Sequence, residues 1–322
     1  MKTLNEIIES GKKAIQHEAL TIKNLENYVD EDFANCVQLI YNSKGRVIIT
    51  GIGKSANISQ KIVATLNSTG TPAVFMHAAD AIHGDLGIIQ KNDIVICISR
   101  SGDTPEIKVL LPLVKTMGNK IIAMVSNRNS FLAKQADYIL NAYIESEACP
   151  NNLAPTSSTT AQLVMGDALA IALLEYRDFS SDDFAKYHPG GTLGKQLYLT
   201  VGDLYRNNEK PQVQEGAHLD SVIMEMTSKR LGATAVINEK EELVGIITDG
   251  DLRRMLFSKK PLNNIIAADI MGKNPRTIDE NELAVKAFQL MEQNNITQLV
   301  VVKNKLYSGI IHIHDILKEG IV

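Results

Sequence analysis

Apolar residues recur at helical spacing through the first part of the chain. Leu4, Ile7 and Ile8 begin the series and Ile40 ends it, with charged residues between the apolar positions. This periodicity predicts two amphipathic helices within residues 4–42.

The pattern then changes to short runs of β-branched residues that alternate with helical stretches. The runs occupy residues 46–50, 73–76, 94–99, 120–125 and 138–141. Strands so rich in Val and Ile, with helices between them, are typical of a parallel sheet whose two faces are both covered by helices. Ligands of such sheets bind beyond the carboxyl ends of the strands, near a switch in strand order.

Two later stretches indicate where this α/β region ends. An apolar helix is predicted over residues 158–176, and several hydroxyl residues at its start are able to cap it. The polar stretch YRNNEKPQVQEG at 205–216 contains proline and is the strongest linker candidate in the chain. We therefore expect an α/β domain over residues 1–200, followed by a different fold.

The C-terminal part is an internal repeat. One constant shift of 64 residues pairs Leu219 with Leu283, Ala235 with Leu299, Gly245 with Gly309 and Asp251 with Asp315. Each copy runs helix, strand, a second strand containing Gly-Ile-Ile, and an aspartate that opens a helix. A period that occurs only twice cannot build a solenoid, so we expect units 201–265 and 266–322 to pack into one pseudosymmetric α+β domain.

The composition is that of a globular chain. Of its 322 residues, 44% are apolar and 22% are charged, and the net charge of −4 gives no reason to expect nucleic acid or an anionic membrane as a partner. The first residues lack a secretory signal, and we expect no apolar run to approach the ~20 residues of a membrane span. Three cysteines, few and far apart, indicate a reduced, cytoplasmic protein.

The segment ICISRSGDTPEI, residues 96–107, ends a predicted strand in a cluster of hydroxyl residues. A helix that follows a parallel strand presents unpaired backbone N–H groups and the positive end of its dipole to whatever lies beyond the strand. Ser99, Ser101 and Thr104 add hydroxyl donors, and Gly102 allows close backbone approach. These features predict a phosphate cradle. The alternative is that Ser101 or Thr104 only caps the following helix.

A glycine turn, TGIGKSA at 50–56, follows the first predicted strand. It fits a dinucleotide-binding pattern, but the acidic residue expected about 20 positions later is missing, because Asp80 comes too late. It also departs from the nucleotide P-loop, because Ile48 occupies the place of the first glycine. Lys54 in this turn is better placed to meet a small anionic substrate.

Further predicted loops carry titratable groups, namely His83 in AIHGDLG, Glu147 in ESEACPNNLAP and His188 in YHPGG. A lone histidine is more often structural than catalytic, and a lone loop glutamate is usually solvated. No HxxxH or CxxC spacing is present, so the spacing predicts no required metal. His312 and His314 share a face of a predicted strand, which favours a chance pair or an effector contact over a metal site.

These motifs together resemble a known family. SRSGDTPE resembles the signature of sugar isomerase (SIS) domains, and GIGKS, HGDLG, EACPNNLAPTSSTTAQLVMGDALA and HPGGTLGK resemble its branch of D-arabinose 5-phosphate isomerases. The two C-terminal units, ending GIITDGDLRRML and GIIHIHDILKEG, resemble CBS motifs. The resemblance covers nearly the whole chain. It implies an α/β, flavodoxin-like parallel sheet of SIS type with helices on both faces, followed by a CBS pair.

The resemblance implies an aldose–ketose isomerase that interconverts D-ribulose 5-phosphate and D-arabinose 5-phosphate through an enediol and so supplies the acidic sugar Kdo. Glu147 matches the family's base, with Glu106 as a second candidate, and His188 matches a histidine that assists ring opening or proton transfer. Such chemistry needs a positioned base and charge-stabilising groups, but neither cofactor nor metal. An inhibitory zinc ion at His83 and His188 is a further expectation.

The resemblance also implies which residues hold the substrate. The phosphate would contact Ser99, Ser101 and Thr104, with Thr50, Gly51, Ser55, Ser158 and Thr159 near the sugar, while Lys54, His83 and Glu106 match other polar residues of the family's site. SIS domains usually associate so that a histidine from a neighbouring chain completes the site, and we expect His188 to do so in a homotetramer. Arg100 stands where the family frequently has an uncharged residue, so it either strengthens phosphate binding or points to solvent.

The CBS pair suggests a nucleotide or sugar-nucleotide effector. Thr248 would meet its phosphate, and Asp251 and Asp315 its ribose, although His312 stands where CBS sites favour Ser or Thr. CBS pairs are also often only dimerisation elements. Two alternative functions stay open, namely another sugar-phosphate isomerase and a sugar-phosphate-sensing regulator without catalysis. The acidic first 45 residues lack the basic recognition helix that such regulators usually carry.

Overall fold

The computed structural model of the protein describes residues 2–257 and 262–321. These residues form two compact units, which meet in the sequence between Tyr187 and His188. Each unit is described by itself below.

The first unit is built on a five-stranded parallel sheet. Its strands are β1 (Val47–Gly51), β2 (Ala73–His77), β3 (Ile94–Ile98), β4 (Lys120–Val125) and β5 (Tyr138–Asn141), in the spatial order β2-β1-β3-β4-β5. The five predicted strand runs are confirmed. The chain direction across the sheet reverses between β1 and β3, and ligands of doubly wound sheets bind at such a switch point.

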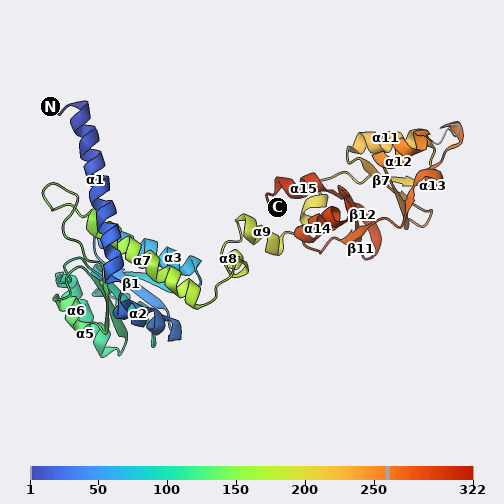
Figure 1. Ribbon diagram of the computed structural model, residues 1–322. Helices are drawn as coiled ribbons and strands as arrows, with labels where there is room; N and C mark the ends of the chain where they lie inside the picture. The colour runs from blue at the N-terminus through green and yellow to red at the C-terminus, as the bar shows by residue number, and fades with distance from the viewer. Residues whose placement is uncertain (1, 258–261, 322) are drawn as a thin grey trace. The chain divides into compact units, whose positions relative to one another are not determined.

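Helices cover both faces of this sheet (Figure 1). Successive strand residues point to opposite faces, so Ile49 and Ile96 lie in one core while Ile48 and Val95 lie in the other. The first core lies under α2 (Glu31–Asn42), α3 (Lys54–Ser68) and α7 (Ser157–Tyr176), and the second under α4 (Ala78–Ala81), α5 (Pro105–Thr116) and α6 (Phe131–Gln135). The unit also contains α1 (Leu4–Leu25), η1 (Glu26–Tyr28), η2 (Asp85–Ile88) and α8 (Ser181–Tyr187).

Helix α7 corrects one expectation. It has 20 residues, and within the described ranges it is the one helix long and apolar enough to cross a membrane by length and composition alone. The prediction that no apolar run approaches this length was therefore wrong. Half of its apolar window is buried inside the unit, and Met165 and Leu169 lie in the core formed with the sheet. Core helices of globular domains pass the same test.

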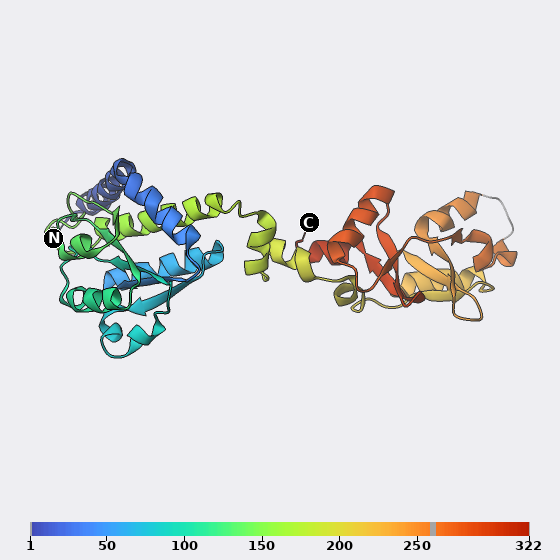
Figure 2. The ribbon, with the colours of Figure 1, turned by 90° about the horizontal axis from the view of Figure 1, so that it is seen from below.

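The second unit contains two small sheets, shown towards the C-terminus in Figure 2. One has the order β6-β7-β8-β9 and the other β10-β11-β12, and in both copies a parallel pair is followed by an antiparallel one. The strands are β6 (Gln212–Gln214), β7 (Ala233–Ile237), β8 (Leu243–Thr248), β9 (Gly272–Lys273), β10 (Thr277–Asp279), β11 (Gln298–Lys303) and β12 (Leu306–His312). The helices are α9 (Thr192–Tyr198), α10 (Val201–Tyr205), α11 (Leu219–Lys229), α12 (Asp249–Phe257), η3 (Leu262–Asn264), α13 (Ala267–Ile270), α14 (Ala284–Asn294) and α15 (Ile313–Lys318).

The two repeats exchange their first helices. Val201 and Leu204 of α10, which precede the first repeat in sequence, are buried in the core of the second repeat. Ala267 of α13, which precedes the second repeat, is buried in the core of the first. Each repeat thus completes the hydrophobic core of the other. The two repeats form one pseudosymmetric domain, as expected.

The stretch 205–216 is not a linker. Tyr205 is buried in the core of the second repeat and Val213 in that of the first. Asn208 donates a hydrogen bond to Asp315 Oδ2 over 2.6 Å. The stretch is therefore packed into the domain, with one residue in the core of each repeat, and is not an exposed connection between domains.

The repeat does not follow one constant shift. Arg230 and Asn295 both end their helices in the left-handed conformation and lie 65 positions apart. Gly245 and Gly309, which sit opposite Val236 and Val301, lie 64 apart. The span from Val236 to Gly245 in the first repeat is therefore one residue longer than the span from Val301 to Gly309 in the second. A single shift of 64 pairs the second strands and the last helices correctly, but it misaligns the earlier elements by one residue.

Candidate active site

The hydroxyl-rich loop after β3 is held together by its own side chains. The Ser99 and Thr104 hydroxyls are 2.9 Å apart, and Ser99 Oγ also accepts a hydrogen bond from the Gly102 N–H over 3.1 Å. Thr104 occupies the N-cap position of α5 but makes no side-chain cap hydrogen bond, and Ser101 Oγ accepts from the Asp103 N–H instead. A simple helix cap by these hydroxyls is therefore wrong, and the loop is fixed in shape before any ligand binds.

Gly102 sets the path of this loop. Its φ of 70° lies in the left-handed region, and a Cβ placed there would lie 2.2 Å from Ser130 Oγ. The Gly102 carbonyl accepts a hydrogen bond from the Leu132 N–H over 3.0 Å, which joins the loop to α6. Any side chain at this position would push the loop away from α6.

The glycine turn after β1 flanks the same switch point. Gly51 ends β1, and Lys54 begins α3 with an exposed side chain. Ser55 Oγ donates to Gln162 Oε1 of α7 over 3.2 Å. The Thr50 hydroxyl is fully buried and has no hydrogen-bond partner within the described residues. These residues lie beside the strand that carries the hydroxyl loop, since β1 pairs with β3.

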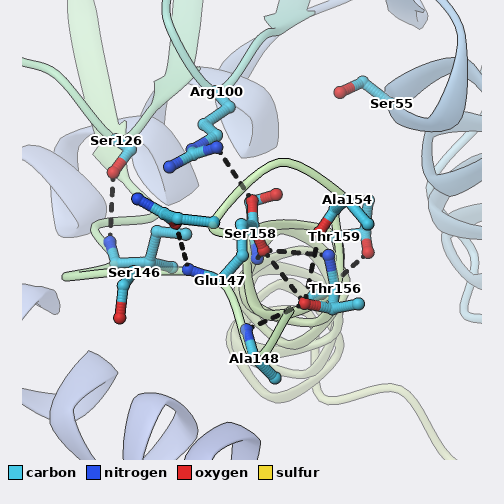
Figure 3. A network of polar contacts seen from close by, with 12 residues as sticks. Ser55, Arg100, Ser126, Ser146, Glu147, Ala148, Ala154, Thr156, Ser158 and Thr159 are labelled. Carbon is cyan, nitrogen blue, oxygen red and sulfur yellow. Dashed lines mark hydrogen bonds and ion pairs between the residues drawn. The ribbon is translucent and has the colours of Figure 1, made fainter. Parts of the chain in front are cut away.

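Glu147 lies in the long loop between β5 and α7, and only 4% of it is exposed. Its Oε2 accepts hydrogen bonds from the Thr156 N–H over 2.8 Å, the Thr156 hydroxyl over 3.2 Å and the Ser158 N–H over 3.1 Å (Figure 3). Thr156 is the N-cap residue of α7 but makes no side-chain cap hydrogen bond. The carboxylate of Glu147 takes that place, so the expected hydroxyl cap is replaced by a residue from outside the helix.

The other carboxylate oxygen of Glu147 is unsatisfied. Oε1 is buried and accepts no hydrogen bond from the described residues, but Arg100 Nη1 lies 3.1 Å from it. Burial raises the pKa of Glu147, but hydrogen bonds from Ser158 and Thr156 and the charge of Arg100 outweigh it, so the pKa lies below its ordinary value. At neutral pH the group is a buried carboxylate with one oxygen available for chemistry.

The loop that carries Glu147 is closed on itself. Asn152, which has a left-handed backbone, accepts a hydrogen bond from the Glu147 N–H on its Oδ1 over 2.7 Å. The Thr156 hydroxyl accepts from the Ala148 N–H over 3.0 Å. Upstream, the Ile144 N–H donates to Ser126 Oγ over 3.0 Å. These contacts fix the position of the carboxylate without help from a ligand.

Sequence reasoning missed the residues that position Glu147. Arg100 appeared only as a departure whose direction was open, and Asn152 and Thr156 were not singled out. The Asn- and Pro-rich composition of EACPNNLAPTSS could have indicated a rigid loop. No local signal indicates that Arg100, from a different loop, contacts Glu147.

Three of the remaining predicted residues, Lys54, His83 and Glu106, make no hydrogen bond or ion pair to this network within the described residues. Lys54 and His83 are exposed, and Glu106 is half-buried in the first turn of α5. Thr159 donates to the Thr156 carbonyl over 2.8 Å within α7. His188 belongs to the second unit, where its carbonyl accepts a hydrogen bond from the Gly191 N–H over 3.0 Å.

The predicted CBS ligand residues already have partners. Asp251 Oδ2 accepts from the Thr248 N–H over 2.9 Å and from the Thr248 hydroxyl over 2.6 Å, while Arg254 contacts Oδ1 over 2.6 Å. In the second repeat, Asp315 Oδ2 accepts from the His312 N–H over 2.8 Å. These aspartates stabilise the starts of α12 and α15.

No group of three or more His, Cys, Asp or Glu side chains within residues 2–257 and 262–321 is arranged to hold a metal ion. The zinc site expected at His83 and His188 stays a prediction. His83 belongs to the first unit and His188 to the second, and each unit is described by itself.

The fold and site place the chain among SIS-domain proteins that carry a CBS pair. A family model described as SIS domain matches residues 39–172, and one described as CBS domain matches residues 201–258 and 267–321.

Full-length relatives narrow this class. Arabinose 5-phosphate isomerase KdsD of Pseudomonas aeruginosa is 46% identical over 98% of both chains. Arabinose 5-phosphate isomerase KpsF of Escherichia coli O6:H1 is 42% identical over 96% of this chain and 95% of its own. An E. coli CFT073 protein, solved in complex with arabinose 5-phosphate, is 39% identical over 58% of this chain and all of its own, with a TM-score of 0.57. The chain belongs to the arabinose 5-phosphate isomerase family.

Proposed function

We propose that this protein interconverts D-ribulose 5-phosphate and D-arabinose 5-phosphate, the reaction named in its relatives, and that the product serves Kdo synthesis. One observation carries the proposal: the buried Glu147 carboxylate has Oε2 fixed by the start of α7 and Oε1 without a hydrogen bond. A base must be fixed in position and yet keep one oxygen open to the proton that it takes.

The reaction needs proton movements only. Glu147 Oε1 takes the proton from C1 of ribulose 5-phosphate while the C2 oxygen gains a proton, which gives an enediol. The protonated carboxyl then returns the proton to C2, and the C1 hydroxyl loses its proton to form the aldehyde of arabinose 5-phosphate. No oxidant, reductant or other co-reactant is consumed. The lowered pKa of Glu147 keeps it ionised and ready to act at neutral pH.

We assign the phosphate to the loop of Ser99, Ser101 and Thr104. This loop is preorganised, and it follows β3 beside the switch point where sheets of this type bind ligands. The 12-residue helix α5 begins at Pro105, directly after the loop, so its positive dipole end faces a bound anion. Lys54, at the turn after the neighbouring strand, adds a second positive charge.

Glu147 is a better base than Glu106. Both follow strands of the sheet, but Glu106 is half-buried and no described residue fixes its carboxylate by a hydrogen bond. Glu147 is held by α7 on one oxygen only. Our proposal therefore assigns proton transfer at carbon to Glu147 and leaves Glu106 to orient the substrate.

The remaining assignments follow the family. His188 moves the hydroxyl proton, supplied by a neighbouring chain of a cytoplasmic homotetramer. The CBS pair binds a nucleotide-type effector, although Thr248 and Asp251 must then exchange their mutual hydrogen bonds for those of the ligand. A sugar-phosphate sensor without catalysis is the less favoured alternative, because a buried, half-satisfied carboxylate serves no evident purpose in it.

The test is turnover in heavy water. Purified protein is incubated with ribulose 5-phosphate in D₂O with a chelator, and the products are followed by ¹H and ¹³C NMR. We expect arabinose 5-phosphate with deuterium at C2. Binding of the sugar phosphate without product would instead support a sensor, and product that forms only after a metal is added would contradict the cofactor-free mechanism.

A further inference from the structure

We infer that Arg100 couples occupancy of the phosphate loop to the release of Glu147, so that the base becomes fully available only when a phosphate is bound. The inference rests on the proposed function, because it assigns a positioning role for the same site. It starts from an unusual contact. A residue of the phosphate loop, flanked by Ser99 and Ser101, directs its guanidinium towards the catalytic carboxylate (Figure 3).

The contact between Arg100 and Glu147 is close but incompletely formed. Nη1 and Oε1 are 3.1 Å apart, yet Oε1 accepts no hydrogen bond of acceptable geometry. The Glu147 side chain is fully buried, whereas that of Arg100 is 38% exposed. Arg100 therefore loses little when its guanidinium leaves Glu147 Oε1 for an anion of higher charge on its exposed side.

A sugar phosphate is such a partner. A phosphate dianion carries more charge than a carboxylate, and a guanidinium binds it through two parallel N–H donors. Arg100 stands between Ser99 and Ser101 in the sequence of the loop assigned to that phosphate, and rotation of its half-exposed side chain towards the phosphate is the movement that we infer. Phosphate and Glu147 Oε1 therefore compete for one cation.

The position of Arg100 differs between the site without substrate and the site with phosphate bound, and each position has a physical reason. Without substrate, Arg100 lies beside a buried carboxylate oxygen that would otherwise face no positive charge. With phosphate bound, Arg100 leaves, and the Glu147 carboxylate keeps only neutral partners, namely Thr156 and Ser158 at the start of α7. The positive charge no longer favours the ionised form of Glu147, so the basicity of Oε1 rises at the moment when a carbon-bound proton is in reach.

The first experiment is a double-mutant cycle read by equilibrium binding of inorganic phosphate, measured by calorimetry at pH 7.5. Glu147→Gln frees Arg100, so phosphate should bind more tightly. Arg100→Gln should weaken phosphate binding. Because Glu147→Gln also removes a negative charge, its effect in the Arg100→Gln background measures that general contribution. We expect Glu147→Gln to strengthen binding by about fivefold more in the presence of Arg100 than in its absence.

The second experiment uses the pH dependence of turnover to compare the pKa of Glu147 in the free enzyme with its pKa in the substrate complex. The acidic limb of kcat/KM reports the free enzyme and that of kcat the substrate complex. Since Arg100 lowers the pKa of Glu147 only before phosphate binds, Arg100→Gln should move the kcat/KM limb to higher pH and leave the kcat limb in place. Arg100→Lys should restore part of the wild-type behaviour. Arg128→Gln, which removes an arginine paired with Asp30 and Asp32, is the matched control and should change neither limb.

The two experiments can overturn the inference without touching the proposed function. Additive effects in the cycle, or equal movement of both limbs in Arg100→Gln, would show a static ion pair rather than a competition. Wild-type protein that does not bind phosphate would contradict both the phosphate-loop assignment and the coupling. Full activity of Glu147→Gln would contradict the proposed function itself, and that outcome is independent of the phosphate cycle.

Discussion

The two units of this protein both place a carboxylate at the start of a helix, but they use it differently. In the second unit, Asp203 and Asp251 lie within the helices that they cap, and the threonine three residues earlier donates both a backbone and a hydroxyl hydrogen bond. In the first unit, Glu147 lies outside α7, in the loop that precedes the helix, and folds back onto its start. The local carboxylates complete their helices.

What differs chemically is the second oxygen. Asp251 Oδ1 is paired with Arg254, and Asp203 is exposed to water. Glu147 Oε1 is buried with only the incomplete contact of Arg100. A capping carboxylate that lies outside the helix, in the loop before it, can be fixed by one oxygen while the other stays open, and our proposal assigns proton transfer to that open oxygen. The comparison teaches that the environment of the second oxygen, rather than the cap itself, distinguishes Glu147 from the aspartates of the second unit.

The largest effect is expected for Glu147→Gln. The amide can still accept from Thr156 and Ser158, so the loop should keep its shape, but the amide cannot take a proton. We expect kcat for ribulose 5-phosphate to fall by about 10² to 10⁴. Initial rates by a coupled or NMR assay measure the loss, and circular dichroism checks the fold. A fall of less than tenfold would place the base elsewhere, with Glu106 the next candidate.

A second, smaller effect concerns a fully paired carboxylate. Glu280 accepts from Tyr205 over 2.9 Å and contacts Arg206 over 3.0 Å and Lys303 over 2.7 Å. Its hydrogen bonds from Lys303, Arg206 and Tyr205 lower its pKa from 4.5 to about 2. A lowered pKa means that the ionised form is favoured by folding. This stabilisation is therefore complete above pH 4.5 and is lost as the pH falls towards 2.

Thermal unfolding at a series of pH values measures this contribution. The wild-type melting temperature should fall between pH 4.5 and 2, and part of that fall should vanish in Glu280→Gln, which starts lower at neutral pH. An identical pH dependence in both proteins would show that Glu280 has no preferential pairing in the folded state.

The smallest effect is expected at a purely structural cap. Asp203→Ala removes both hydrogen bonds to Thr200 at the start of α10, and loss of such a cap costs about 1 kcal/mol of stability. Denaturant unfolding should show this loss, whereas kcat of the isomerase should stay within about twofold of wild type. A large loss of kcat in Asp203→Ala would break the proposed distinction between carboxylates that build helices and the one that does chemistry.

The sequence predicts the first unit well because its signals are local. The Val- and Ile-rich runs fall on the five observed strands, and the hydroxyl loop falls at the carboxyl end of β3. Glu147 was predicted as the base, but through a family resemblance, and its role stays a prediction. The contacts that hold Glu147 could not be predicted. Thr156 follows in the same loop, where nothing in the sequence marks it as a partner, and Arg100 comes from the loop after β3 and meets Glu147 only through the sheet order.

The second unit shows the complementary difficulty. Polar composition at 205–216 suggested a linker, although Tyr205 and Val213 belong to hydrophobic cores. The constant shift of 64 hid one extra residue between Val236 and Gly245, because apolar residues on either side of a turn can still be matched when the alignment is offset by one position. Both errors concern how the two repeats are connected and aligned. The pattern of side chains within one repeat does not specify this.

The exchange of α10 and α13 between the repeats also bears on how the chain acquires its structure during synthesis. Val201 and Ile321 are buried in the same core, so a core of the second unit closes only after nearly all of that unit has left the ribosome. The first unit contains its own cores within residues 25–173 and can fold while the rest is being made. The isomerase unit can therefore gain its structure first. Within the CBS pair, the core of the first repeat needs only residues 213–271, whereas the core of the second repeat closes last, when the two ends of the unit's sequence come together.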